Sequence, residues 1–197
     1  MKQNMKLGVV LLAAGKSERF GSNKLLADYH GKPLICRALE AASAVSVHKA
    51  CVVTGSDEIA SFAQTYGFDV IRNTDVHLGQ AHSIHLGIAA MKEMDAALLM
   101  VCDQPRLTAQ SLVRLADAFW DSGKGIACLR DETHTGNPAI FSKVYFSQLL
   151  ALEGDRGAKG ILRANPDDLL DVRCAHENEL ADADTPRALE SMCLNDR

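Results

Sequence analysis

The chain has 197 residues, of which 47% are hydrophobic and 23% are charged, a composition sufficient for an ordinary globular core. We expect one domain over residues 1–197, because no linker-like stretch divides the sequence. The net charge of −4 provides no overall positive field and argues against nucleic acid or an anionic membrane as a partner.

Three further features indicate a cytoplasmic protein. The six cysteines are widely spaced without a Cys-x-x-Cys pair, which is typical of small buried residues in a reduced compartment. The segment before Gly8 is too short and polar for a secretory signal. No segment approaches the roughly 20 apolar residues of a membrane span. We therefore expect a cytoplasmic location and no membrane contact.

The first predicted element is a buried parallel strand that begins near Gly8 and ends in small residues at Gly15. Three cations and a hydroxyl follow closely, namely Lys16, Ser17, Arg19 and Lys24. Cations beside a glycine turn suit a polyanion that lies against open backbone N–H groups. The stretch therefore predicts a triphosphate-binding loop.

Two other glycine loops fit this stretch less well. A Walker A loop requires Gly-x-x-x-x-Gly-Lys-Ser/Thr, but Val10 occupies the position of its first glycine. A dinucleotide fingerprint requires Gly-x-Gly-x-x-Gly, which residues 13–21 do not contain. Taken alone, the stretch also allows a plain strand-to-helix turn with surface lysines.

Helices and strands then alternate. Apolar residues from Ile35 to Ala42 recur at helical spacing, and residues 48–54 predict the second strand. Ser56 can cap the next helix, and residues 67–73 close that helix and add a short strand. This alternation is typical of a parallel α/β protein.

A polar loop runs into a helix near Gly79, so that residues 79–83 lie where free N–H groups point outward. Ser83 also has the plainer interpretation of a capping residue. His82 and His85 lack a metal-ligand partner at helical spacing, and we assign them no role.

Residues 96–102 form the most apolar predicted strand, as expected at the centre of a parallel sheet. The strand ends in Asp103-Gln-Pro105, where open α/β sheets bind ligands. Beside a triphosphate, Asp103 would bind Mg²⁺; as an isolated residue it would only solvate or cap the loop.

The remaining chain predicts a helix capped by Thr108, a strand over 125–130, a helix over 143–152 and a strand over 168–174. Near the end, Asp182 and Asp184 precede a natural cap and first helical residue, Thr185-Pro186. Residues two apart on an extended chain point the same way, so both carboxylates can face one cation.

The motif Leu-Ala-Ala-Gly-x-Ser-x-Arg-Phe-Gly-x-x-Lys-Leu at residues 12–25 resembles the opening motif of the molybdenum cofactor nucleotidyltransferases and their relatives that act on sugar phosphates. The resemblance extends over residues 7–190. It implies a three-layer α/β/α Rossmann-like nucleotidyltransferase fold with a mostly parallel central sheet. It also implies that the loop formed by Leu12, Ala13, Ala14, Gly15, Lys16 and Ser17 wraps the nucleotide, with Arg19 and Lys24 on its phosphates.

Other motifs extend the resemblance. The Gly-x-x-x-Ser segment implies that Gly79, Gln80 and Ser83 hold the base and ribose. The Asp-x-Pro and Asp-x-Asp-Thr-Pro segments imply a Mg²⁺ site at Asp103 and Asp184, with Asp182 a further candidate. The Gly-x-Pro-x-x-Phe and Gly-Asp-x-Gly-Ala-Lys segments imply an acceptor side formed by Gly136, Asn137, Pro138, Arg156 and Lys159; alone, they are equally an ordinary turn and surface charges.

The motifs are most similar to those of the cytidylyltransferase branch. Leu-Ala-Ala-Gly and Gly-Asn-Pro-Ala-Ile-Phe favour CTP over GTP by analogy, but Asn137 replaces the usual histidine and His82 replaces a small residue. The implied reaction transfers CMP to the phosphate of a molybdopterin-type acceptor, with Lys24, Arg19 and Asp103 catalytic. Alternatives are a guanylyl or sugar-phosphate nucleotidyltransferase, or a non-catalytic carrier that hands the cofactor to a molybdoenzyme.

Overall fold

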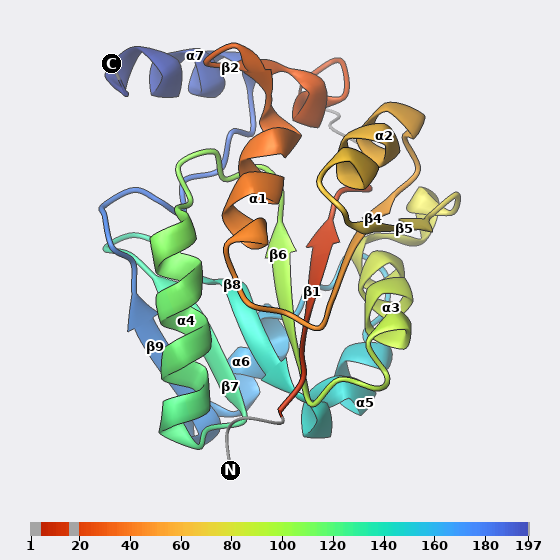
Figure 1. Cartoon of the computed structure of the whole chain (residues 1–197), viewed down its shortest axis with the longest axis vertical. Helices are drawn as coiled ribbons and strands as arrows, with labels where there is room; N and C mark the ends of the chain where they lie inside the picture. Colours follow the sequence, from red (N-terminus) through yellow and green to blue (C-terminus); the bar gives the residue numbers. More distant parts are fainter. Residues whose placement is uncertain (1–4, 16–19, 197) are drawn as a thin grey trace.

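The computed structural model describes residues 5–15 and 20–196 and contains a seven-stranded sheet in the order β5-β4-β1-β6-β8-β7-β9 (Figure 1). Among the described strands of this sheet, β8 alone runs against its neighbours, so the sheet is mostly parallel, as predicted. The strands are β1 (Leu7–Leu12), β4 (Lys49–Thr54), β5 (Asp69–Arg72), β6 (Ala96–Val101), β7 (Ile126–Arg130), β8 (Thr135–Ser142) and β9 (Leu169–Arg173). A separate small hairpin pairs β2 (Asp28–Tyr29) with β3 (Lys32–Pro33).

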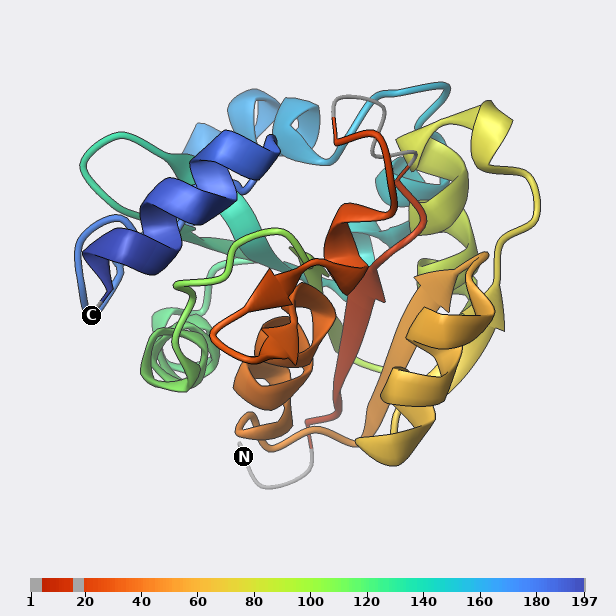
Figure 2. The same ribbon diagram turned by 90° about the horizontal axis from the view of Figure 1, so that it is seen from above.

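Helices cover both faces of the sheet, which confirms the predicted three-layer α/β/α fold (Figures 1 and 2). One face packs against α1 (Leu34–Ser43), α2 (Asp57–Thr65), α4 (Ala109–Ser122) and α7 (Pro186–Asn195). The other packs against α3 (Gln80–Ala90), α5 (Phe146–Leu150) and α6 (Lys159–Ala164). Short 3-10 turns complete the structure: η2 (Lys24–Leu26), η3 (Val76–Leu78), η4 (Lys143–Tyr145) and η5 (Pro166–Asp168). In the described part of the chain, no helix has the length and apolar character needed to cross a membrane.

The central strands are apolar on both faces because both faces are covered. In β1, Val9 and Leu11 pack on the α1 side, whereas Val10 packs on the α3 side. All three side chains are fully buried. This two-sided burial explains why the sequence of β1 shows a continuous apolar run instead of an alternating pattern.

The order of the strands creates the position for a site. From β1 the chain moves outward to β4 and β5, and it then crosses back to place β6 on the other side of β1. The crevice at the carboxyl ends of β1 and β6 is therefore a topological switch point, the place where open α/β sheets bind ligands. The glycine turn follows β1, and Asp103 follows β6.

Helix α3 packs closely against β1 at Gly87. A Cβ atom at Gly87 would lie 2.3 Å from Cγ1 of Val10. A larger residue would require Val10 or the helix to shift, so Gly87 allows α3 to pack closely against β1.

We predict that Gly87→Ala destabilises the protein by about 1–3 kcal/mol, because the added methyl group overpacks the contact with Val10. Gly160→Ala is the matched control. Gly160 lies in α6, and a Cβ atom there would meet no atom within 4 Å. That change should stabilise the helix by up to about 1 kcal/mol. Urea unfolding of both variants measures the two effects, and equal midpoints would contradict the prediction.

Candidate active site

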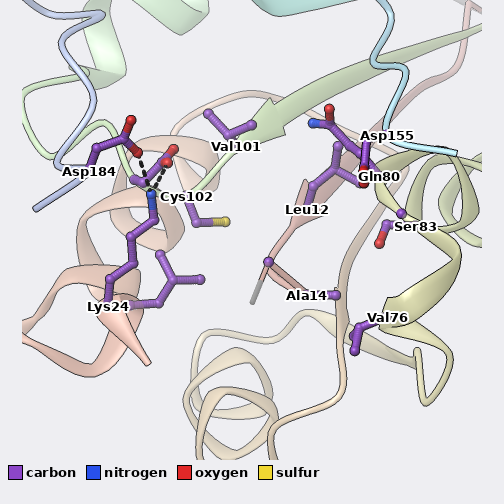
Figure 3. Close-up of a pocket in the computed structure, with 14 residues that line it drawn as sticks. Leu12, Ala14, Lys24, Val76, Gln80, Ser83, Val101, Cys102, Asp155 and Asp184 are labelled. Atoms are coloured by element: carbon purple, nitrogen blue, oxygen red, sulfur yellow. Dashed lines mark hydrogen bonds and ion pairs between the residues drawn. The ribbon is translucent and has the colours of Figure 1, made fainter. Parts of the chain in front are cut away.

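A cavity of about 470 Å³ opens at the carboxyl ends of β1 and β6 (Figure 3). This volume falls in the range of small-molecule and cofactor sites. Nine residues that the sequence singled out line it: Leu12, Ala14, Gly15, Lys24, Gly79, Gln80, Ser83, Asp103 and Asp184. Segments distant in the sequence thus meet around one hollow.

One end of the cavity holds a lysine between two carboxylates. Nζ of Lys24 lies 2.5 Å from Oδ2 of Asp103 and 3.0 Å from Oδ1 of Asp184 (Figure 3). Burial opposes the charge on Lys24, but attraction to Asp103 and hydrogen bonds to both carboxylates outweigh it, so the pKa of Lys24 is raised. The ammonium therefore stays protonated, and the site favours a cation at this point.

Local structure positions each member of this group. Asn23 caps η2 by accepting a hydrogen bond from the N–H of Leu25 at 3.2 Å, which holds the turn that carries Lys24. The N–H of Ala183 donates to the backbone oxygen of Asp103 at 2.8 Å. This bond joins the end of β6 to the segment that carries Asp184.

A buried glutamine strengthens the same junction. The side-chain amide of Gln104 donates to the backbone oxygen of Leu180 at 3.2 Å and to Oδ1 of Asp182 at 3.1 Å. Gln104 is only 7% exposed. The sequence analysis missed this role of Gln104, because its partner Asp182 lies 78 residues away. In the sequence, the one hint is the position of Gln104 directly after Asp103.

Asp182 and Asp184 thus have different neighbours, although both belong to one extended stretch. Asp184 reaches Lys24, whereas Asp182 pairs with Gln104. Burial raises the pKa of Asp182, and the nearby charges of Asp103 and Asp184 add to the effect. Three carboxylates close together therefore accumulate negative charge beside the cavity.

The donor set fits a divalent cation such as Mg²⁺. Oδ1 of Asp103 is buried and has no hydrogen-bond partner among the described residues, which leaves a lone pair for a metal ion. Within the same described residues, no group of three or more His, Cys, Asp or Glu side chains has the spacing of a metal site. Asp103 and Asp184 would supply two ligands, and phosphate and water oxygens the rest, as Mg²⁺ commonly requires.

The opposite wall of the cavity is the amino end of α3 (Figure 3). Gly79 is the N-cap residue and has a φ of +83°, a conformation that favours glycine. Ser83 does not cap the helix; its hydroxyl accepts a hydrogen bond from Nδ2 of the buried Asn73 at 2.9 Å. The hydroxyl therefore has a fixed orientation beside the cavity.

The loop after α5 packs directly on this wall. The backbone oxygen of Gly154 accepts a hydrogen bond from the N–H of Ala81 at 3.0 Å, and a Cβ atom at Gly79 would lie 2.4 Å from the Gly154 carbonyl. Asp155 consequently lines the cavity. Sequence reasoning selected Arg156 from this loop, because a cation was expected to meet a phosphate.

The predicted acceptor-side residues lie outside the lining of this cavity. Asn137 accepts a hydrogen bond from the N–H of Val101 at 3.1 Å and so holds the end of β6, next to the buried Pro138. Gly136 lies close to Lys159, whereas the side chains of Arg156 and Lys159 are exposed. The sequence prediction that these residues bind the acceptor stays a prediction.

Some predicted loop residues have other positions. Ala13 belongs to the core, and its N–H donates to the backbone oxygen of Val53 at 2.9 Å. Lys16, Ser17 and Arg19 lie outside the described residues.

The fold and the cavity together define an α/β protein with a polar site at the switch point of its sheet. The family described as the MobA-like NTP transferase domain matches residues 9–169. The chain therefore belongs to the MobA-like NTP transferase family, as the resemblance at its amino end implied.

Three curated relatives are similar over most of their length. The chain is 28% identical over 191 residues to the purine catabolism protein PucB of Bacillus subtilis, covering 90% of this chain and 91% of PucB. It is 29% identical over 156 residues to a probable molybdenum cofactor guanylyltransferase of Pyrococcus horikoshii, covering 79% and 78% of the two chains. It is 28% identical over 191 residues to nicotine blue oxidoreductase of Paenarthrobacter nicotinovorans, covering 89% and 91%.

Solved structures share the fold. The crystal structure of Rv0371c from Mycobacterium tuberculosis superposes with a TM-score of 0.82 at 24% identity, covering 96% of this chain and 98% of that one. A manganese complex of Rv0371c has a TM-score of 0.78 at 22% identity, covering 96% and 99%. The architecture of the sheet is thus common to these proteins.

We predict that Asp182→Asn increases the free energy of unfolding at pH 7, without added metal, by less than about 1 kcal/mol, because solvent screens the charge of this exposed side chain. The raised pKa means that the ionised carboxylate is penalised in the folded state above that pKa. The gain should disappear as the pH falls below the carboxyl's ordinary range, where Asp182 is protonated in both states. Urea unfolding from pH 3 to 8 measures this, and a destabilised variant at pH 7 would contradict it.

The control for this measurement is Asp69→Asn. Asp69 is exposed on β5, at the edge of the sheet. Its replacement should change the free energy of unfolding by less than about 0.5 kcal/mol.

Proposed function

We propose that the protein is a Mg²⁺-dependent nucleotidyltransferase that transfers CMP from CTP to the phosphate of a molybdopterin-type acceptor and releases pyrophosphate. The observation that supports this most directly is the meeting of Lys24, Asp103 and Asp184 at one end of the cavity. Paired carboxylates suit a divalent cation, and a cationic side chain suits the phosphates of a triphosphate. The family of the chain supplies the class of reaction.

In the proposed reaction, an oxygen of the acceptor phosphate attacks the α-phosphorus of the bound triphosphate. The new P–O bond forms as the bond between the α-phosphorus and the bridging oxygen breaks, and the electron pair leaves with pyrophosphate. The protein aligns the two reactants and offsets the developing charge, so no covalent intermediate is needed.

The residues divide this work. Lys24, together with Arg19 from the glycine loop, would stabilise the negative charge on the departing pyrophosphate. Asp103 and Asp184 would hold the divalent ion, with Asp182 beside them. When bound, Mg²⁺ supplies charge neutralisation on the phosphate oxygens. The manganese complex of Rv0371c supports a divalent ion in this fold.

The nucleotide would extend from the end of the cavity that holds Lys24, Asp103 and Asp184 to the wall formed by the amino end of α3. Leu12, Ala14, Gly15, Lys16 and Ser17 would surround its phosphates, and Gly79, Gln80 and Ser83 would hold its base and ribose. The preference for CTP rests on the Leu-Ala-Ala-Gly motif.

The acceptor would bind outside the nucleotide cavity. We assign its phosphate to Arg156 and Lys159, and its body to Gly136, Asn137 and Pro138. The name of the Pyrococcus horikoshii relative supports a molybdenum cofactor as the acceptor. Residues 1–197 would then act as one cytoplasmic domain that passes its product to a molybdoenzyme.

We predict that Asp103→Asn and Lys24→Met each lower the rate of pyrophosphate release by about a hundredfold, because each removes a preorganised charge. The measurement uses purified protein, CTP, Mg²⁺ and molybdopterin, and chelation of the metal should abolish the signal. Near-normal release by both variants would refute the assignment. CTP binding without any pyrophosphate would instead favour the carrier function.

Two controls match these variants. Asp57 and Lys32 form ion pairs with Arg72 and Glu40. Asp57→Asn and Lys32→Met remove the same charges away from the cavity and should leave the rate unchanged.

We also predict that CTP raises the melting temperature more than GTP, ATP or UTP in the presence of Mg²⁺. A ligand at 100 times its dissociation constant adds about 2.7 kcal/mol of stability. A larger shift with GTP would reassign the nucleotide and leave the reaction class intact.

A further inference from the structure

Tyr29, Arg106 and Asp196 form a second group of contacts between three segments of the chain. This group lies apart from the contacts of Lys24 with Asp103 and Asp184. Asp196 accepts hydrogen bonds from the hydroxyl of Tyr29 and from Arg106. Nε and Nη2 of Arg106 lie 2.9 Å and 2.8 Å from Oδ1 of Asp196. No sequence motif indicates this group, because its members are far apart along the chain.

These three residues come from the same segments that carry Lys24, Asp103 and Asp184 at one end of the cavity. Tyr29 belongs to β2, which closely follows the η2 turn that begins at Lys24. Arg106 lies in the turn that follows Asp103. Asp196 is the C-cap residue of α7, the helix that begins just after Asp184. Each of the three segments is therefore joined to the others at two separate points.

This second junction is stronger than a typical surface ion pair. The side chains of Arg106 and Asp196 are only 21% and 27% exposed, and Tyr29 is 4% exposed. Burial opposes ionisation of Asp196, but the hydrogen bonds from Arg106 and Tyr29 outweigh it and hold the pKa of Asp196 below its usual range. Charge-assisted bonds with two donors fix geometry as well as adding energy.

Docking of α7 does not depend on this contact alone. Leu189 and Met192 of α7 are buried in the core cluster that also contains residues of α1 and α4. Their packing holds the helix against the body of the protein, so the contribution of Asp196 is to set where the helix lies relative to Tyr29 and Arg106. A rigid helix transmits that setting to Asp184 at its other end.

We propose that Asp196 is a positioning residue for the divalent cation: through Tyr29 and Arg106 it fixes the spacing of Lys24, Asp103 and Asp184. The inference rests on the proposed function, because it assumes that the two carboxylates bind a metal ion with the triphosphate. It adds a residue on the far end of α7 that touches neither the nucleotide nor the metal.

The test measures Mn²⁺ binding to the full chain in the presence of CTP by electron paramagnetic resonance. Asp196→Asn should weaken Mn²⁺ binding by about tenfold, as loss of an outer partner of a metal site typically does. Asp196→Glu keeps the carboxylate and should restore most of the affinity. Asp57→Asn is the control, because it breaks an Arg–Asp pair of similar length, 2.7 Å, far from the contact.

Circular dichroism at the same temperature establishes that each variant is folded, so a loss of affinity is not a loss of fold. If Asp196→Asn does not fold, Tyr29→Phe carries the test, because it removes one hydroxyl and should weaken Mn²⁺ binding by about threefold. Unchanged Mn²⁺ affinity in folded Asp196→Asn, or in Tyr29→Phe where that variant carries the test, would overturn the proposal. Failure of the unsubstituted protein to bind Mn²⁺ with any of the four triphosphates would overturn the proposed function, and this inference with it.

Discussion

The ammonium of Lys24 between Asp103 and Asp184 is the interaction around which the site is built. Two carboxylates that both lie within 3.0 Å of one nitrogen atom repel each other unless that nitrogen carries a positive charge. The partly buried position strengthens both the repulsion and the attraction, so one ammonium group links side chains from three segments of the chain.

The sheet makes this convergence possible. Because β1 and β6 are adjacent and parallel, their carboxyl ends deliver the glycine turn and Asp103 to the same edge. The single reversed strand, β8, places Asn137 beside the end of β6, where it holds the N–H of Val101. The architecture therefore determines which residues meet, and the loops determine what they can bind.

Much of the fold could be predicted because its signals are local. The continuous apolar runs of β1 and β6 indicated buried parallel strands, and Ser56, Thr108 and Thr185 cap helices where the sequence indicated them. These features depend on residues within one turn or one strand, so spacing alone reveals them.

The site was only partly predictable, for a physical reason. Asp103 stood out because it follows the central strand, where open α/β sheets bind ligands. Gln104, Asp155 and Asp196 did not, because their roles arise only when distant segments pack together. Single polar residues on loops have no periodicity, and their partners are defined by the tertiary structure.

The contact between Gly79 and Gly154 has a consequence for how such enzymes diverge. Because one backbone rests on the other, the loop after α5 cannot be exchanged for a relative's loop without also changing the start of α3. The two segments would then have to change together, and chimaeras that graft one alone would inherit a steric conflict.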